Sequence, residues 1–172
     1  MRIQHALISH CGLLAFGLAA AHADGLSEFQ AQVNMCAKAF AARPATEVVY
    51  VTAVNSWVKR VYAKAQVRYD VRKTDSLVSP LIGTIEITDA IASLTAMDEQ
   101  TAATLDPSLA ARKRLTFVTR MRFAYQSGRW VFVNATETSR FNDPDAITHS
   151  TELKIADLAR PGQGTAECLP KS

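Results

Sequence analysis

Basic and aromatic side chains recur at even spacing in two separate parts of the chain. Lys64, Arg68 and Arg72 form the first group, and the second consists of Arg120 and Arg122 followed by two aromatic residues. Residues an even number apart in a β-strand point to the same face. Guanidinium groups bind carboxylates or phosphates, and aromatic rings stack on other rings or on sugars. The pattern predicts a sheet face that binds an anionic or carbohydrate-like ligand through Arg68, Arg72, Arg120, Arg122, Trp130 and Phe132.

The aromatic residues and the arginines of this predicted face each have a simpler interpretation. A helix packed over the sheet would bury the aromatic residues in the core. The arginines would then form an ordinary solvated surface together with Asp70, Glu86 and Glu137. Which face of the sheet the first helix covers decides between these interpretations.

A carboxylate inside a predicted strand offers a different chemistry. Asp70 lies between Arg68 and Arg72, and Tyr69 precedes it. Burial in a pocket raises the pKa of a carboxyl group and lets it act as a general base. On a solvated face the same carboxylate would only pair with its neighbouring arginines, which stabilises little. Asp70 and Tyr69 are therefore the candidate catalytic residues of an enzyme that needs no cofactor.

Other motifs that carry chemistry are few. The sequence has no His-Glu-x-x-His, no Gly-x-Ser-x-Gly and no glycine-rich phosphate loop. Asp143, Asp145 and His149 lie close together, but the Asn-Asp-Pro-Asp run that contains the acids is typical of a turn. We expect His149 to be exposed in a loop, and we expect no metal site.

Residues 1–23 have the three parts of an export signal. Arg2 provides a positive start, an uncharged and mostly apolar run follows, and Ala21-His22-Ala23 matches the small-x-small cleavage pattern. The apolar run is too short for a comfortable membrane span. We expect cleavage between Ala23 and Asp24, and a periplasmic or secreted protein without a membrane span. Export and a net charge of only +3 argue against a nucleic-acid partner.

Cleavage at this position would remove Cys11 and leave Cys36 and Cys168. An even pair of cysteines in an exported chain predicts a disulfide. The bond would close a loop of roughly 130 residues and tie the glycine- and proline-containing tail at residues 160–164 to the first helix. Two free, buried thiols are the alternative.

The spacing of apolar residues changes along the chain from helical to strand-like. Helical spacing predicts a helix over residues 27–42. Residues 46–59 fit both a strand and a helix, and we favour a second helix. Strict alternation predicts a strand over residues 61–72 and a further strand over residues 81–88.

Residues 115–125 and 130–138 alternate most clearly and predict a β-hairpin. Gln126-Ser127-Gly128 would join them as a three-residue turn with a bulge, which pairs Tyr125 with Arg129. This register places the odd-numbered apolar residues of both strands on one face. The even-numbered residues, which include the two aromatic ones and the arginines, then share the other face.

Together these elements predict an α+β fold, with one N-terminal helix or two packed on a curved antiparallel sheet of about four strands. We expect one domain over residues 24–172, with a loop-rich tail from about residue 139. The order of elements across residues 26–138 resembles the cystatin-like roll and the roll of the nuclear-transport-factor superfamily. The segment YDVRKTDSLVSP at residues 69–80 is similar to a segment of small exported bacterial proteins. Such rolls include enzymes, binding proteins and inhibitors, so the resemblance implies a fold and no activity.

The composition is that of a globular protein, with 48% hydrophobic and 20% charged residues, which excludes a collagen-like, disordered or multi-span membrane chain. The first functional hypothesis is an exported, non-enzymatic binding protein for a small anionic or sugar ligand. The second is a periplasmic inhibitor or immunity-type protein that binds a partner protein through residues 89–114. We interpret that segment as a lid or edge cover with a short helix near residues 96–104. The cofactor-free enzyme is the third hypothesis.

Overall fold

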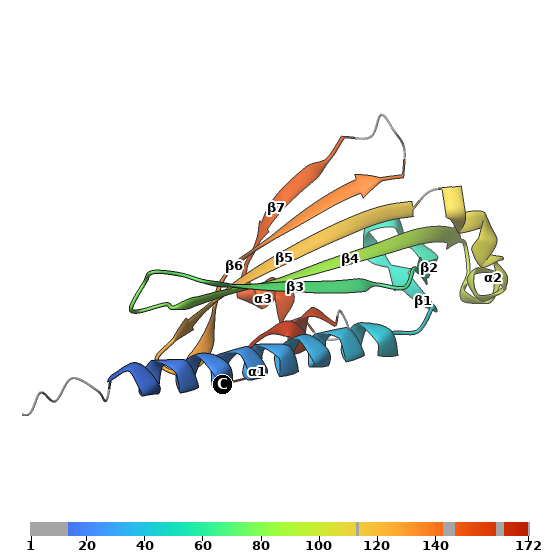
Figure 1. Ribbon diagram of the computed structural model, residues 1–172. Helices are drawn as coiled ribbons and strands as arrows, with labels where there is room; N and C mark the ends of the chain where they lie inside the picture. The colour runs from blue at the N-terminus through green and yellow to red at the C-terminus, as the bar shows by residue number, and fades with distance from the viewer. Residues whose placement is uncertain (1–13, 113, 143–146, 161–163, 172) are drawn as a thin grey trace, which may run out of the picture.

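The computed structural model describes residues 14–112, 114–142, 147–160 and 164–171. Within these residues seven antiparallel strands form one sheet, and helix α1 lies along one of its faces (Figure 1). Strands contain 68 of the 150 described residues. The predicted α+β roll with about four strands is therefore wrong, and the fold is mainly β. Segments that we expected to be helix or cover pair in the sheet instead.

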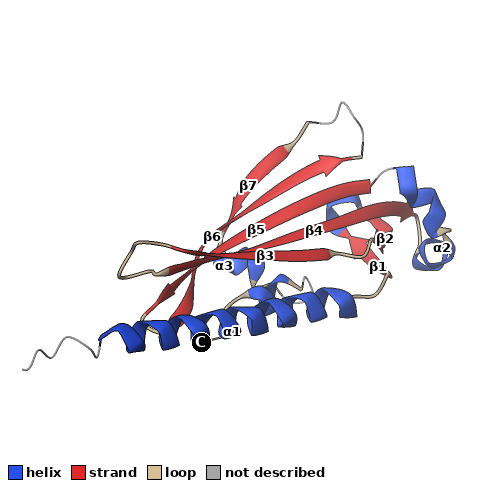
Figure 2. Ribbon diagram, viewed as in Figure 1, coloured by secondary structure: helices blue, strands red, loops and turns tan. Residues whose placement is uncertain are grey.

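The strands follow the long helix α1, with short helices between and after them (Figure 2). The helices are α1 (Leu14–Ala42), α2 (Glu99–Thr104) and α3 (Ile155–Leu158), with 3-10 helices η1 (Thr52–Val54), η2 (Pro107–Arg112) and η3 (Thr165–Cys168). The strands are β1 (Thr46–Val51), β2 (Ser56–Tyr62), β3 (Gln66–Lys73), β4 (Leu81–Ala96), β5 (Arg114–Gln126), β6 (Arg129–Phe141) and β7 (His149–Leu153). Their order in the sheet is β1-β2-β4-β5-β6-β7, and β3 pairs with β4 as well. The chain after residue 139, predicted to be mostly loop, contributes β7, α3 and η3.

Residues 46–59, for which we favoured a helix, form β1, η1 and the first half of β2. The two strands pair antiparallel from Thr46 opposite Val61 to Val51 opposite Ser56. The valine and threonine side chains in this segment are β-branched, which suits a pleated sheet better than a helix. Pairing between β2 and β4 then overrides the helical spacing of the apolar residues.

β4 is the longest of the described strands and connects the two halves of the sheet. β3 pairs with its first half and β2 with its second half, along the same edge. The single strand predicted over residues 61–72 is therefore two strands separated at residues 63–65. The amide of Ala63 still donates to the carbonyl oxygen of Ala90 at 2.8 Å, so the interruption stays against β4.

The lid predicted at residues 89–114 is divided between the second half of β4, α2 and η2. Lys59 Nζ donates to the carbonyl oxygens of Ala103 and Leu105 at 2.8 and 2.6 Å. Ala102 on α2 is fully buried. The segment is an anchored cap over one end of the sheet, opposite the tip of the β3–β4 hairpin (Figure 1).

A hairpin forms where the alternation predicts it, between β5 and β6, but its turn differs from the prediction. The turn has two residues, Ser127 and Gly128, with φ angles of 51° and 79°. Positive φ at both positions is typical of a type I′ turn, whose twist matches that of the strands. Tyr125 consequently pairs with Trp130 and not with Arg129.

This register brings the aromatic residues of β6 to the face that α1 covers. Trp130 lies opposite Tyr125, and Phe132 lies opposite Phe123, so each pair points to one side. A β-bulge at Val133 then shifts the register by one residue. The prediction that Trp130 and Phe132 share a face with the arginines is therefore wrong, because a one-residue shift moves every side chain to the other face.

The core lies between α1 and the inner face of the sheet, which we define as the face that carries Leu81, Ile85 and Ile87. Its other buried members are Phe29, Val33, Cys36, Phe40, Met121, Phe123, Tyr125, Trp130, Ala135, Leu158 and Cys168. Gly83 permits the close approach of the helix, because a Cβ atom there would come within 2.5 Å of the Phe29 ring. A side chain at this position would push α1 away from the sheet.

The predicted disulfide between Cys36 and Cys168 is confirmed, and it joins α1 to η3. The two Cα atoms are 4.4 Å apart although 132 positions separate the residues in the sequence. Gln32 Nε2 also donates to the carbonyl oxygen of Cys168 at 2.6 Å. Both contacts are buried, so the C-terminal segment is fixed against the helix.

The predicted export signal, residues 1–23, lies partly outside the described structure. Residues 1–13 are outside it, and α1 begins at Leu14 and runs through the expected cleavage position before Asp24. The helix predicted over residues 27–42 is the later part of α1. The helices in the described ranges lack the combination of length and apolar character that a membrane span requires.

Candidate functional site

The four predicted arginines do share one face, which is the outer face of the sheet, opposite α1. Arg68 and Arg120 are both cross-strand neighbours of Glu86, and Arg122 lies opposite Thr84. Arg120 Nε bonds Glu86 Oε2 at 2.7 Å. Arg72 is on the same side of β3, with its Nε 3.6 Å from a carboxylate oxygen of Asp70. The outer face is thus a solvated surface of partly paired arginines.

Trp130 and Phe132 do not belong to that surface. Trp130 is 3% exposed, and its indole N–H donates to the carbonyl oxygen of Gly25 on α1 at 2.8 Å. Its ring centroid is 4.5 Å from that of Phe29, and the Phe132 ring lies at 5.9 Å from Phe123. The structure therefore divides the predicted ligand-binding set into an arginine surface and an aromatic core.

Asp70 and Tyr69, the candidate catalytic pair, point to opposite faces of β3. The Asp70 side chain is 66% exposed, so the desolvation that a general base requires is missing. The Tyr69 hydroxyl donates to the Gln30 side chain of α1. His149 is exposed at the start of β7, and Asp143 and Asp145 lie outside the described residues.

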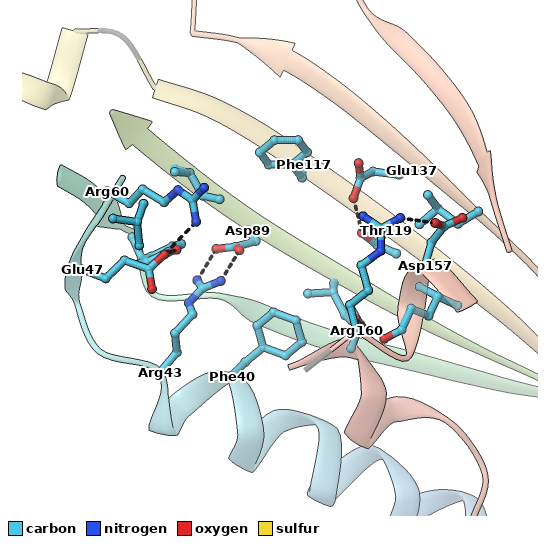
Figure 3. A pocket seen from close by; sticks show the side chains of 17 residues that line it. Phe40, Arg43, Glu47, Arg60, Asp89, Phe117, Thr119, Glu137, Asp157 and Arg160 are labelled. Atoms are coloured by element: carbon cyan, nitrogen blue, oxygen red, sulfur yellow. Dashed lines mark hydrogen bonds and ion pairs between the residues drawn. The ribbon is translucent and has the colours of Figure 1, made fainter. Parts of the chain in front are cut away.

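A hollow lies on the inner face, beyond the C-terminal end of α1 (Figure 3). It is a cavity of about 630 Å³ between the sheet, the end of α1 and the C-terminal segment. Apolar side chains from six elements line it, among them Phe40, Ile87, Ile91, Phe117 and Leu158. Charged side chains stand on two sides of this apolar middle (Figure 3).

The first charged group joins the end of α1 to β4. Arg43 follows the last residue of α1, and its two Nη atoms bond the two carboxylate oxygens of Asp89 at 2.6 and 2.7 Å. The guanidinium also lies 4.0 Å from the centroid of the Tyr62 ring, a cation–π contact. The hydrogen bonds that Arg43 donates to Asp89 raise the pKa of Arg43, against the opposing effect of burial. The result is a fixed, neutralised pair in the lining of the cavity.

A second charged group lies beside the first, on β1 and β2. Glu47 accepts hydrogen bonds from the Tyr62 hydroxyl and from Arg60 Nη1, the latter at 2.9 Å. The Tyr62 hydrogen bond is the main cause that lowers the pKa of Glu47, and Arg60 adds to it. Burial raises the pKa of Tyr62, which keeps its hydroxyl a donor. β1 and β2 pair Glu47 directly with Arg60, so the register of this hairpin builds the group.

The third charged group stands on the opposite side of the cavity. Arg160 Nη2 bonds Asp157 Oδ1 at 2.6 Å, and Thr119 Oγ1 donates to Glu137 at 3.3 Å. Figure 3 shows these four side chains gathered together, with Phe117 and Phe40 between them and the Arg43 group. Asp157 and Arg160 belong to the segment that the disulfide holds in place.

Charged side chains make up much of the lining of this cavity. Its lining carries three guanidinium groups and four carboxylates, most of them paired with one another. Among the described residues the lining includes no cysteine and no histidine. Paired guanidinium and carboxylate groups keep spare N–H donors and oxygen acceptors in fixed directions. The site can therefore hydrogen-bond a polar ligand at both ends and contact an apolar surface between them.

Sequence reasoning did not find this cavity. Its charged residues come from the residue after α1, from β1, β2, β4 and β6, and from the C-terminal segment, and only folding brings them together. Asp89 did offer one signal. The odd-numbered positions of residues 81–88 form the apolar side of the predicted strand, and Asp89 continues that series, so its carboxylate is expected on the buried face. An acid at such a position requires a cationic partner.

No family model, curated protein or solved structure matches the chain. The resemblance to cystatin-like and nuclear-transport-factor rolls therefore stays untested, and the function is argued from the geometry of the cavity.

The Glu47 group makes stability depend on pH in a defined direction. Because the folded state lowers the pKa of Glu47 below its ordinary value of 4.5, the carboxylate stabilises the fold at neutral pH. This contribution is lost as the pH falls through the folded-state pKa. We expect Glu47→Gln to lower the free energy of unfolding by less than about 1 kcal/mol at neutral pH, since the pair is partly exposed. Wild type and variant should converge in urea titrations well below pH 4.5, and a constant difference at all pH values would contradict this role.

Proposed function

We propose that this is an exported binding protein that holds a small carbohydrate-like ligand in the inner-face cavity. The observation that carries the proposal is the arrangement of the cavity, with ion-paired groups at both ends and apolar and aromatic side chains between them. A volume of about 630 Å³ lies within the usual range of small-molecule sites. No enzymatic group is needed for this role.

The charge of the cavity favours a neutral ligand over an anion. Four carboxylates and three guanidinium groups line it, so an added anion would meet a small excess of negative charge. Hydroxyl groups can both donate to carboxylates and accept from guanidinium groups. The C–H surfaces of a sugar ring would meet Phe117 and Phe40 in the middle.

Export is the second part of the proposal. Residues 1–23 would be removed as a signal, which leaves Asp24 as the first residue. The Gly25 carbonyl that receives the Trp130 hydrogen bond would stay in the chain. The disulfide between Cys36 and Cys168 fits an oxidising compartment, the periplasm or the outside of the cell.

The alternative of an inhibitor that acts through residues 89–114 has less support. That role needs a segment that projects from the fold. Lys59 instead hydrogen-bonds this segment to the sheet, and Ala102 of α2 is fully buried. A binding protein with an internal cavity uses more of the observed geometry.

Titration of neutral mono- to trisaccharides into the processed, oxidised protein tests the proposal by calorimetry. We expect at least one saccharide to bind, and Phe117→Ala to weaken it roughly tenfold through loss of the ring contact. Arg122→Gln on the outer face is the matched control and should leave affinity unchanged. Absence of saccharide binding, or a loss in Arg122→Gln with none in Phe117→Ala, would exclude the cavity as the site.

A further inference from the structure

The tip of the β3–β4 hairpin, residues 74–80, carries two adjacent apolar side chains far from the core. Leu77 is 96% exposed and Val78 is 72% exposed. The hairpin extends past the neighbouring strands at one end of the molecule, as Figure 1 shows. Single exposed apolar residues are common, but a neighbouring pair on a projecting turn is a candidate contact point.

Hydrogen bonds hold the tip in its outward shape. The amide of Thr74 donates to the carbonyl oxygen of Pro80 at 2.9 Å, and the amide of Ser79 donates to Ser76 Oγ at 3.1 Å. Gln126 Nε2 bonds Ser79 Oγ at 2.8 Å, which fixes the tip beside the β5–β6 turn. The apolar pair is therefore presented to the surroundings by a braced loop.

Cationic side chains surround the base of this tip. Arg72 and Lys73 are consecutive on β3, so they point to opposite faces of the hairpin, and Arg129 lies at the adjacent β5–β6 turn. Within the described residues, neither Lys73 nor Arg129 has an acidic side chain within ion-pair distance. Asp75 is the one acid of the tip itself. The outer face adds Arg68, Arg122 and Arg120, the last of which is paired with Glu86.

We propose that this end of the molecule binds the surface of an anionic lipid bilayer. Leu77 and Val78 enter the interfacial region, and Arg72, Lys73 and Arg129 contact the negatively charged headgroups. An apolar tip with a basic base has the two parts that reversible peripheral binding combines. Two apolar side chains are a small patch beside the roughly 800 Å² that each partner of a typical protein complex buries. The inference does not depend on the ligand of the cavity.

Vesicle flotation with the processed, oxidised protein tests this inference. We expect binding to phosphatidylcholine vesicles that contain phosphatidylglycerol, weak binding to pure phosphatidylcholine, and release as salt screens the headgroups. The double variant Leu77→Ser/Val78→Ser should bind about tenfold more weakly, and Lys73→Gln/Arg129→Gln should lose the preference for anionic lipid.

The matched control makes the same change at the other end of the molecule. Met97 is 92% exposed near α2 and Leu109 on η2 is also exposed, so Met97→Ser/Leu109→Ser removes equivalent apolar surface and should leave vesicle binding unchanged. All these side chains are exposed or at strand ends, and thermal unfolding should confirm that each variant folds. The lipid assignment would be overturned if the tip variant bound vesicles as well as wild type does, or if the control variant lost as much binding as the tip variant. Capture of a protein partner without vesicle binding would also overturn it. The Phe117→Ala variant should bind vesicles normally. A failure of the saccharide proposal can therefore be distinguished from a failure of the lipid proposal.

Discussion

Replacing both Cys36 and Cys168 with alanine is expected to lower the free energy of unfolding by about 4–5 kcal/mol. The bond joins residues separated by 132 positions, and a cross-link over so long a loop removes much of the conformational entropy of the unfolded chain. Net stabilities of single domains are about 5–15 kcal/mol, so this loss is a large fraction of the total. Truncation of two fully buried side chains adds a smaller packing loss of the same sign.

Urea unfolding of oxidised wild type and the double alanine variant measures this effect. A reductant should shift the wild-type transition toward that of the variant and leave the variant unchanged. Hydrogen exchange should rise first in α3 and η3, because among the described residues the Gln32 side chain would then make the one hydrogen bond from α1 to this segment, through the backbone carbonyl of residue 168. A difference below about 1 kcal/mol would mean that the unfolded chain is already compact when reduced.

The disulfide also shows which features a sequence can predict. Once the predicted export signal is set aside, two of the three cysteines remain and leave a single pairing, so no geometry was needed. The alternation of charged and apolar residues likewise placed Arg68, Arg72, Arg120 and Arg122 on one face, because strand periodicity fixes direction without knowledge of the partner strands.

Local register and tertiary pairing were not predictable in the same way. Two- and three-residue turns at Ser127 and Gly128 differ by one residue in pairing, and that residue decides whether Trp130 is core or surface. The bulge at Val133 restores the buried position of Ala135 further along β6, so an unbroken alternation could not describe both halves. Residues 46–59 were ambiguous because helical spacing and β-branched composition compete, and pairing with β4 decided the outcome.

The cavity was beyond sequence reasoning for a different reason. Arg43 and Asp89 are 46 residues apart, and neither belongs to a spacing pattern that identifies the other. The strand and helix that carry them are needed for the core, and the pair forms where α1 ends above β4. The same crossing of α1 over the sheet thus buries Trp130 at one end and opens the charged cavity at the other.

Removing one member of the Arg43–Asp89 pair should destabilise the fold strongly. The two side chains are only 13% and 12% exposed, so Arg43→Met leaves a nearly buried carboxylate without its partner, at a cost of about 3–5 kcal/mol. Asp89→Asn should cost somewhat less, because the amide still accepts one hydrogen bond. The double variant Arg43→Met/Asp89→Asn removes both charges and should be more stable than Arg43→Met alone. Chemical denaturation of the four proteins gives the coupling energy of the pair. Additive losses, or single losses below about 1 kcal/mol, would show that water reaches the Arg43–Asp89 pair. The pair would then not shield this side of the cavity from solvent.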